Sequence, residues 1–264
     1  MLGALKSVYI YRNLILQLVK RDIAARYQGA LIGASWSLIF PLLSLAVYGF
    51  VFGVILKPRW PGVEDSLQFT LILFSGLLVF NFFSECLSRA PSLMVANANF
   101  VKKVVFPIDI LIWVPIVAAL YHLMLGIIAW LLLCLVVGQG ISWTFLLFPF
   151  AIIPLVFIVA GFSWFLSALG VYVRDVAQVI GVSMQLLLYL GPIIYPREAL
   201  PKDFRWVMLI NPLTVPVEQF RNVVNFGASL DWLQIAIFWL ASLMVFLAGK
   251  RFFDKCRHGF ADVV

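Results

Sequence analysis

Residues 110–173 read ILIWVPIVAALYHLMLGIIAWLLLCLVVGQGISWTFLLFPFAIIPLVFIVAGFSWFLSALGVYV, a stretch of 64 residues without a single Asp, Glu, Lys or Arg. One helix of that length would extend about 96 Å, whereas the hydrocarbon core of a bilayer is about 30 Å thick. The stretch must therefore fold back on itself. Gly138, Gly140 and the interfacial Trp143 mark the turn. The sequence thus predicts a hairpin of two membrane-spanning helices, 110–137 and 144–171.

The composition of the whole chain agrees with a membrane protein. Of its 264 residues, 64% are apolar and 12% are charged, and the mean hydropathy is +1.05. A soluble domain has about a quarter of its residues charged, so this chain has too little polar surface to cover a soluble globule. The composition also excludes a disordered chain, a collagen-like repeat and a secreted scaffold held by disulfides.

Further charge-free runs on either side of the hairpin predict the remaining spans. A charged side chain at the centre of a membrane costs about 2.5–3.5 kcal/mol, so runs without charge locate the helices that cross. The additional spans are predicted at 34–56, 66–84, 176–196 and 232–250. The predicted fold class is therefore an all-α polytopic membrane protein with six transmembrane helices.

The positions of Lys and Arg orient the chain. Six spans place both termini on one side of the membrane. If that side is the cytoplasm, the inner segments hold the entire formal net charge of +7, and the outer segments carry equal numbers of acidic and basic residues. This distribution follows the positive-inside rule, so both termini are expected in the cytoplasm. The positive-inside distribution accounts for the net positive charge, so a nucleic-acid partner is not needed to explain it.

The segment before the first span is too charged to cross. Apolar residues recur at helical spacing between Val8 and Ile23, while Arg12, Lys20 and Arg21 lie on the opposite face. This pattern predicts an amphipathic helix that lies in the inner membrane interface. The alternative is a basic flank that serves only to orient the first span. The predicted organisation is a cytoplasmic interface helix, 1–33, followed by a transmembrane domain, 34–264.

Two inner connections are candidate docking sites. The segment 85–107, between the second and third spans, is longer than a bare connector and has room for a short helix with a polar face. Such a helix suits docking to a soluble partner; the alternative is a surface helix without one. The second connection is the short turn at Arg174-Asp175, which places a charge pair at the membrane edge.

The outer segment between the fifth and sixth spans, 197–230, is the largest departure from a simple bundle. Pro192 and Pro196 break the helix before it, since proline lacks a backbone donor. Two stretches, 206–210 and 217–224, are apolar or amphipathic but too short to cross. They are predicted to be short re-entrant helices in the outer leaflet, shielded by protein. A folded extracellular loop is the alternative.

Aromatic residues form a stripe on the first span. Trp36, Phe40, Tyr48 and Phe52 are spaced at multiples of four, so they share one helix face. Such a stripe packs against lipid or core in many proteins. The functional alternative is a channel lining for a sugar chain, because aromatic rings stack on the C–H faces of sugars and tolerate variation in the repeating unit, as stacking platforms do for nucleic-acid strands.

Several kinds of chemistry lack residues to perform them. No G-x-x-x-x-G-K-[ST] phosphate loop occurs in the sequence, and no soluble segment is large enough for an ATPase. No carboxylate lies near the middle of a predicted span, as ion-coupled carriers usually require. The 3 cysteines and 2 histidines support neither a metal site nor a catalytic set. No catalytic residue and no metal ligand is therefore expected, and His122 is interpreted as a hydrogen-bonded residue inside the bundle.

A series of short motifs runs through nearly the whole chain. They are Arg21-Asp22-Ile23, Arg26-Tyr27, Gly33-Ala34-Ser35-Trp36, Pro41, Asn97, Asn99, Lys102-Lys103, Phe106-Pro107, Arg174-Asp175, Pro192, Tyr195-Pro196, Leu200-Pro201, Asn211-Pro212, Glu218-Gln219-Phe220-Arg221 and the ending Gly259–Val264. In the order and spacing of these motifs the chain resembles permeases of the ABC-2 type, in the branch that exports O-antigen, capsule and teichoic-acid polysaccharides.

The resemblance implies roles for these segments. Segment 85–107 is expected to couple to an ATPase, the outer helices to form an exit gate, and the first and fifth spans to line a channel. The implied coupling residues are Arg89, Asn97, Asn99, Lys102, Lys103, Arg174 and Asp175. The implied gate residues are Pro192, Pro196, Asn211, Pro212, Glu218 and Arg221. The implied channel residues are Trp36, Phe40, Tyr48, Phe52, Tyr189 and Tyr195.

The resemblance also implies partners and an activity. The chain is expected to form a homodimer with two copies of a separate nucleotide-binding subunit, which holds the ATP and Mg²⁺, so this chain itself binds no cofactor. It is expected to be a transport subunit rather than an enzyme, in the bacterial inner membrane, exporting a lipid-linked polysaccharide, with lipopolysaccharide O-antigen as the preferred substrate. The alternatives are a capsule or teichoic-acid exporter, an ABC-2 exporter of drugs or small lipids, and an ion-coupled carrier.

Overall fold

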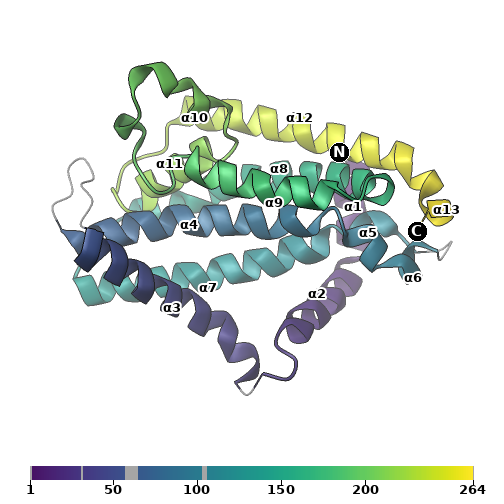
Figure 1. The fold of residues 1–264 in the computed structure, drawn as a ribbon, viewed down its shortest axis with the longest axis horizontal. Coiled ribbons are helices and arrows are strands. Elements are labelled where there is room, and N and C mark those ends of the chain that lie inside the picture. The colour runs from purple at the N-terminus through teal and green to yellow at the C-terminus, as the bar shows by residue number, and fades with distance from the viewer. Residues whose placement is uncertain (1, 31, 57–64, 103–105, 264) are drawn as a thin grey trace.

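The structure is a computed structural model that describes residues 2–30, 32–56, 65–102 and 106–263. The fold is helical throughout these ranges, as predicted, and the long helices lie side by side along one axis (Figure 1). The α-helices are α1 (Leu2–Ile10), α2 (Arg12–Arg26), α3 (Trp36–Tyr48), α4 (Ser66–Arg89), α5 (Leu93–Ala96), α6 (Ala98–Val101), α7 (Trp113–Val137), α8 (Phe148–Tyr172), α9 (Val176–Tyr189), α10 (Trp206–Ile210), α11 (Thr214–Val224), α12 (Trp232–Cys256) and α13 (Phe260–Val263).

Four helical stretches are long and apolar enough to cross a membrane: Leu67–Arg89, Ile108–Val137, Trp143–Tyr172 and Trp232–Gly259. They correspond to four of the six predicted spans. The other two predicted spans contain shorter apolar helices, Trp36–Val51 and Val176–Tyr189. The polytopic helical fold class is therefore confirmed, while the total of six crossings stays a prediction.

The ends of the helices differ from the predicted boundaries for physical reasons. α4 continues past the predicted end at residue 84 to Arg89, because its charged residues Glu85 and Arg89 find partners on α2 and α7. α9 stops at Tyr189 instead of reaching residue 196, since Pro192 cannot continue a helical hydrogen-bond ladder. At the other end of the predicted first span, α3 passes into π-helical turns over Gly49–Leu56.

The turn inside the charge-free stretch lies at Gly138. This glycine has a φ of +74° and ends α7 in the left-handed conformation that closes many helices. A short 3₁₀ segment, Trp143–Leu147, then leads into α8. The two helices run in opposite directions beside each other (Figure 1).

α8 and α12 pack through glycines. A Cβ atom on Gly161 would lie 2.4 Å from the carbonyl oxygen of Val245, and one on Gly249 would lie 2.0 Å from the carbonyl oxygen of Gly161. Any larger residue at either position would push the two backbones apart. This close approach is the way small residues join helices in membranes, where no hydrophobic effect drives them together.

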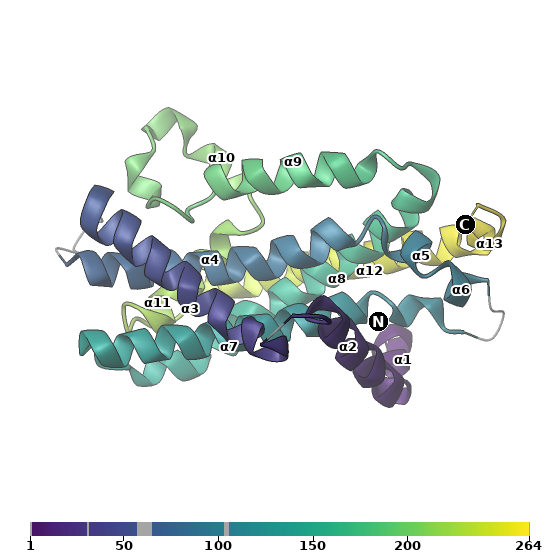
Figure 2. The same ribbon diagram turned by 60° about the horizontal axis from the view of Figure 1, so that its bottom comes forward.

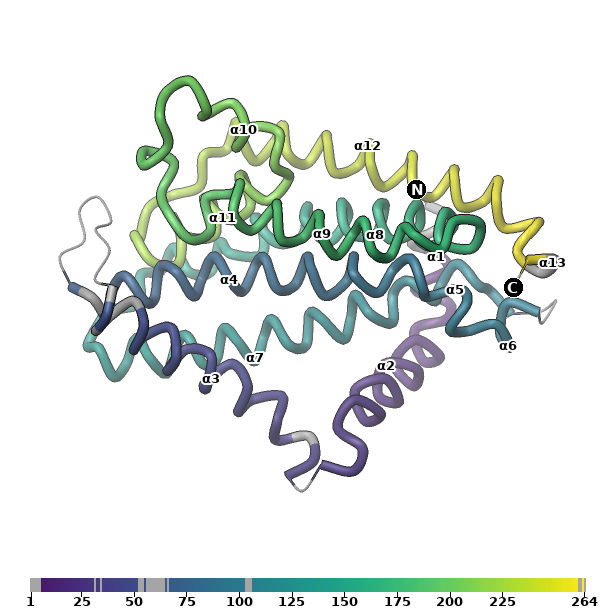
Figure 3. Tube along the Cα trace, in the orientation of Figure 1, coloured from purple at the N-terminus to yellow at the C-terminus, as the bar shows by residue number. Residues whose placement is uncertain are grey.

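The N-terminal helices lie across one side of the bundle. The helix breaks at Tyr11 into α1 and α2, and α2 turns Ile15, Leu18 and Val19 inward, where all three are buried. The predicted amphipathic face is therefore used against the protein itself. α2 and α3 then form a V that projects from the bundle (Figures 1 and 3). Both termini lie in the half of the molecule that holds α5 and α6 (Figures 1 and 2).

The segment between α9 and α12 forms the opposite end of the molecule. It contains two short 3₁₀ turns, Arg197–Ala199 and Lys202–Phe204, followed by α10 and α11. α10 lies on the outside and exposes Leu209 and Ile210. α11 enters the bundle and buries Val217, Phe220 and Val223 (relative exposure 0–1%). The prediction of two short helices between the last spans therefore holds, and only α11 is enclosed by protein.

Candidate functional site

A cavity of about 680 Å³ opens between α3, α4, α7 and the end of α2. It exists because α3 leans away from α4 and α7 as the chain returns from the tip of the V (Figure 3). The lining combines aromatic and aliphatic side chains with polar ones, the mixture typical of ligand sites. The residues are Arg26, Tyr27, Ala30, Trp36, Ser37, Phe40, Pro41, Ser44, Tyr48, Phe74, Leu78, Asn81, Phe82, Ser84, Glu85, Ala119, His122 and Leu123.

One wall of the cavity carries the aromatic stripe of α3. Trp36, Phe40 and Tyr48 all line it, and Phe40 has 66% of its surface exposed. An aromatic side chain so exposed to an open cavity is free to stack on a ligand. Phe52, the fourth residue of the predicted stripe, has a side chain outside those that the structure describes. The structure thus brings three of the predicted channel residues to one surface.

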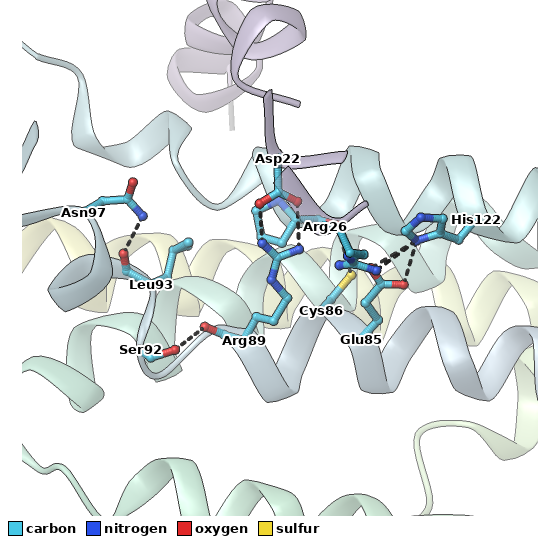
Figure 4. A network of polar contacts seen from close by, with 10 residues as sticks. Asp22, Arg26, Glu85, Cys86, Arg89, Ser92, Leu93, Asn97 and His122 are labelled. Carbon is cyan, nitrogen blue, oxygen red and sulfur yellow. Dashed lines mark hydrogen bonds and ion pairs between the residues drawn. The ribbon is translucent and has the colours of Figure 1, made fainter. Parts of the chain in front are cut away.

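The inner end of the cavity holds a charged cluster (Figure 4). The Glu85 carboxylate on α4 lies 2.7 Å from Nη2 of Arg26 and 3.1 Å from Nδ1 of His122 on α7. The Tyr27 hydroxyl lies 3.5 Å from Nε2 of the same histidine. Burial raises the pKa of Tyr27 above its ordinary value, so its hydroxyl keeps its proton and can act as a donor. Three separate elements therefore meet at Glu85.

Two features of this cluster were not predicted from the sequence: the place of His122 on a cavity wall and the place of Glu85 on α4. His122 was predicted to be hydrogen-bonded inside the bundle, and its bonds to Glu85 agree with that, but its place on the wall of a cavity was not foreseen. Glu85 was assigned to the inner connecting segment rather than to α4. The available signal was the isolated carboxylate at the end of an apolar run, which needs a cationic partner when it is partly buried.

A second ion pair ties α2 to the end of α4 (Figure 4). Arg89 donates two hydrogen bonds to the Asp22 carboxylate, over 3.0 and 2.5 Å. The guanidinium of Arg21 lies 5.7 Å from the centre of the Phe100 ring on α6, within the range of a cation–π contact. α2 is therefore joined to the end of α4 and to α6, which lies in the middle of the connection between α4 and α7. Arg89, predicted as a contact for an ATPase, is engaged within the chain.

The end of the molecule that holds α5 and α6 exposes some of the predicted coupling residues and engages others within the chain. Asn99 and Lys102 are exposed on and just after α6. The amide of Asn97 is turned back onto its own helix, where it donates to the carbonyl of Leu93 over 2.9 Å. Lys103 lies outside the described residues.

The turn between α8 and α9 lies at the same end of the molecule (Figure 1). Its two charged residues, Arg174 and Asp175, are exposed, as docking residues must be. The backbone of Pro91 packs directly on Gly170, where a Cβ atom would lie 2.1 Å from the Pro91 carbonyl oxygen. The start of the connection between α4 and α7 is thus held against the last turn of α8.

The opposite end of the molecule contains a smaller pocket of about 360 Å³. Four predicted gate residues line it: Pro192, Pro196, Glu218 and Arg221. The other two, Asn211 and Pro212, form the turn between α10 and α11. There the Asn211 side chain donates to the carbonyl of Leu187 on α9 over 3.0 Å. The predicted gate residues are therefore distributed over one connected region.

Tyr189 and Tyr195, predicted as channel residues, lie at the same end of the molecule as the smaller pocket. The hydroxyl of Tyr195 donates to the carbonyl of Tyr189, and 61% of the Tyr189 surface is exposed. Neither residue belongs to the lining of the large cavity. The described channel residues thus occupy two places, with Trp36, Phe40 and Tyr48 on the cavity wall and Tyr189 and Tyr195 at and just after the end of α9.

Among the residues that the structure describes, no group of three or more His, Cys, Asp and Glu side chains is close enough to hold a metal ion. Cys86 and Cys134 are buried within helices, and the Cys86 thiol donates to the carbonyl of Pro115 over 3.9 Å.

Comparison with known proteins gives consistent matches. Residues 13–225 match the family described as ABC-2 type transporter. The chain is 25% identical to an "O-antigen export system permease protein RfbA" of Klebsiella pneumoniae over 96% of its own length and 95% of that protein. It is also 25% identical to the Myxococcus xanthus protein of the same name over the full length of both chains. It is 26% identical to the "Polysialic acid transport protein KpsM" of Escherichia coli, over 88% of this chain and 90% of that protein.

Proposed function

This chain belongs to the ABC-2 type transporter family, and we propose from that premise that it is the permease subunit that exports a lipid-linked polysaccharide, lipopolysaccharide O-antigen, across the bacterial inner membrane. As a membrane permease it is a transport subunit without catalytic chemistry of its own. In the proposed complex, two copies of the chain pair with two copies of an ABC ATPase subunit that binds and hydrolyses MgATP. Both termini and the α5–α6 segment face that ATPase in the cytoplasm.

The observation that carries the proposal is the aromatic wall of the large cavity. Trp36, Phe40 and Tyr48 face an open space of about 680 Å³, which is large enough for several sugar-sized groups. Stacking on aromatic rings suits a polymer that must slide, because every sugar unit has an apolar face. Ser37, Ser44 and Asn81 add hydrogen-bonding groups to the same lining.

The ion pairs of α2 support a route by which the ATPase moves the cavity. An ATPase bound to the exposed Asn99 and Lys102 pushes on the α5–α6 segment. The segment is joined to α2 through Arg21 and Phe100, and α2 is joined to the cavity through Arg26 and Glu85. A shift of α5 and α6 therefore changes the position of α2 and, beyond it, of α3 with its aromatic wall.

The relatives favour one substrate over its alternatives. The first two relatives named above are O-antigen export permeases by name and match at least 95% of each chain, whereas the polysialic acid transport protein matches 88% of this chain. At 25% identity this supports the polysaccharide class more strongly than the individual glycan. The second candidate is a capsule or teichoic-acid exporter. An ABC-2 exporter of drugs or small lipids is third, and the row of aromatic residues along the cavity wall argues for a polymer instead.

Deletion of this chain in its own host tests the proposal. We expect an undecorated lipid-linked glycan to accumulate on the cytoplasmic side, and lipopolysaccharide on the cell surface to lose its O-antigen. The accumulated glycan is identified by mass spectrometry of the extracted lipids, and re-expression of the chain is the control. Accumulation of a capsule or teichoic-acid intermediate would replace the O-antigen proposal by the second candidate. Normal surface glycans together with altered drug sensitivity would favour the third.

A further inference from the structure

The outer end of the bundle is organised around one buried guanidinium. Arg221 on α11 has 3% of its surface exposed. Its Nε donates to the carbonyl of Ile72 on α4 over 2.9 Å, and its Nη2 donates to the carbonyl of Ile193 over 2.6 Å. Its Nη1 donates to the carbonyl of Pro192. One side chain therefore joins α4, α11 and the irregular segment that follows α9.

The irregular segment needs these donors. Between Tyr189 and Pro196 the chain is not α-helical, and both Pro192 and Ile193 are buried. Carbonyl groups released from a helix inside a membrane must find donors within the protein, because no water is present to supply them. Arginine is suited to this task, since its planar guanidinium presents five donors in fixed directions.

Gly76 on α4 provides the space for the guanidinium. A Cβ atom at this position would lie 2.2 Å from Nη2 and 2.9 Å from Cζ of Arg221, much closer than non-bonded atoms approach. The guanidinium therefore lies directly on the backbone of α4, and a larger residue at position 76 must displace it. The glycine and the arginine form one unit built from distant parts of the chain.

Hydrogen bonds that do not involve Arg221 also attach α11 to its neighbours. The Asn225 amide donates to Ser75 over 2.7 Å, Thr144 donates to the carbonyl of Val223 over 2.8 Å, and Gln139 donates to the carbonyl of Asn225 over 3.1 Å. These contacts join α11 to α4 and to the turn after α7. The bonds of Arg221 to Pro192 and Ile193 have a different role, because they hold the segment after α9 in place. That segment forms part of the wall of the outer pocket.

We propose that Arg221 is a latch that keeps the outer end of the transport pathway closed at rest. It holds Pro192 and Ile193 against α4 and α11, and their release from the guanidinium opens the outer pocket. Arg221 acts by positioning the backbone of this segment and need not touch the transported molecule. The inference rests on the proposed function, in which the outer helices form the exit.

Cysteine labelling in intact cells expressing the full chain tests the latch. Ile193→Cys, at a position with 0% exposure, is introduced after Cys86, Cys134 and Cys256 are replaced by alanine. A membrane-impermeant maleimide is added from outside. We expect Gly76→Ala to speed labelling of this cysteine by at least about tenfold, because the loss of one hydrogen bond to a charged group changes an opening equilibrium by that factor or more.

Gly126→Ala is the matched control. A Cβ atom on Gly126 would lie 2.2 Å from a methyl carbon of Leu78, so this variant crowds α4 as strongly without touching Arg221. We expect it to leave labelling at the parent rate. Equal labelling of the Gly76→Ala chain and the parent would overturn the latch, and so would an equal rise in both glycine variants.

Arg221→Lys covers the case in which Gly76→Ala does not accumulate in the membrane. Lysine keeps the positive charge, but its single nitrogen cannot occupy the three positions from which Nε, Nη1 and Nη2 of Arg221 reach their carbonyl groups. Faster labelling of Ile193→Cys in this variant supports the latch, and an unchanged rate overturns it. Because labelling requires neither the glycan nor the ATPase, failure of the latch is distinguishable from failure of the proposed function.

Discussion

Arg89 and Asp22 form a bidentate ion pair, with distances of 3.0 and 2.5 Å, that joins the inner end of α4 to α2. The pair lies where the chain leaves α4 for the α5–α6 segment, so it connects the surface proposed for the ATPase to the helix beside the cavity. About a third of the Arg89 side chain is exposed, so solvent screens part of the attraction (relative exposure 32%). The pair is better suited to transmitting movement than to stabilising the fold.

Reversal of one charge in this pair is predicted to break the connection. Arg89→Asp places two carboxylates together and should lower the free energy of unfolding by about 1 kcal/mol, the upper range for an exposed pair. ATP-driven export should fall by much more than this small loss of stability explains. The double variant Asp22→Arg with Arg89→Asp restores the opposite charges, and we expect it to recover export in cells. A double variant as defective as the single one would show that the pairing itself is unimportant.

Removal of the carboxylate at the inner end of the cavity is predicted to destabilise the protein. Glu85→Ala leaves Arg26 and His122 without their shared acceptor and should cost about 1–3 kcal/mol. Thermal unfolding of the detergent-solubilised protein measures the change. Glu198→Ala is the control, because Glu198 is exposed near the other end of the molecule. Equal unfolding temperatures for the two variants would contradict the structural role given to Glu85.

The aromatic wall is predicted to be needed for export and dispensable for folding. Trp36→Ala, Phe40→Ala and Tyr48→Ala should each reduce surface glycan several-fold, since each removes a stacking partner worth about 1–3 kcal/mol. Phe50→Ala is the matched control, because Phe50 follows the same helix, is 59% exposed and is outside the cavity lining. Immunoblotting of the membranes checks that all four variants accumulate. Comparable export by the Phe40 and Phe50 variants would exclude the wall as the sliding surface.

Acidic substitutions on the α5–α6 surface are predicted to abolish export without unfolding the protein. Asn99→Glu with Lys102→Glu changes the charge of an exposed surface and should leave the fold intact. We expect export to be lost while the protein accumulates normally and its unfolding temperature stays unchanged. Lys202→Glu, on an exposed turn at the opposite end, should export at the parent rate. Export at the normal rate by the double variant would remove this surface from the mechanism.

The stability of the outer pocket is predicted to depend on pH through Glu218. Burial raises the pKa of this carboxyl above its ordinary value, and the attraction of Arg197 and Arg221 offsets only part of that effect. A raised pKa means that the native state prefers the protonated form. The contribution to stability is therefore complete at low pH and is lost as the pH rises through the pKa of the folded protein.

Glu218→Gln tests this dependence because it keeps the shape of the side chain without the charge. We expect the variant to unfold at a higher temperature than the parent at pH 7, and the difference to disappear near pH 4. Differential scanning fluorimetry at a series of pH values measures it. A parent protein more stable than Glu218→Gln at pH 7 would show that the carboxylate is favourably paired in the native state.

The charge-free runs of the sequence predict much of the helical architecture. They do not predict which residues meet at the cavity and at the outer pocket. The 64-residue stretch required a hairpin, and Gly138 supplies its turn. The partners of Arg89 and Arg221 could not be predicted, because each pairs with atoms far away in the sequence: Asp22 for the first, and Ile72 for the second. Backbone carbonyl groups leave no trace in the sequence. Of the groups around Arg221, Gly76 does leave a signal in the sequence, because a glycine inside an apolar helix suggests a close approach by another group.

The sequence predicted correctly that Trp36, Phe40 and Tyr48 lie on one surface, because all three residues belong to a single helix. Trp36, Phe40 and Tyr48 share a face of α3, and helical periodicity determines such a face without knowledge of the rest of the fold. Tyr189 lies on another helix, and its position relative to the stripe depends on how α9 packs. No spacing along the chain encodes that packing.

Transport by purified components tests the central proposal most directly. Proteoliposomes containing this chain, an ABC ATPase subunit from its host and a lipid-linked glycan should move the glycan across the bilayer only when MgATP and both proteins are present. Translocation is followed by the accessibility of the glycan to an added glycosidase. The account predicts no movement by this chain alone. Translocation by the lone chain under a proton gradient, or a complex that hydrolyses ATP without moving any glycan, would contradict it.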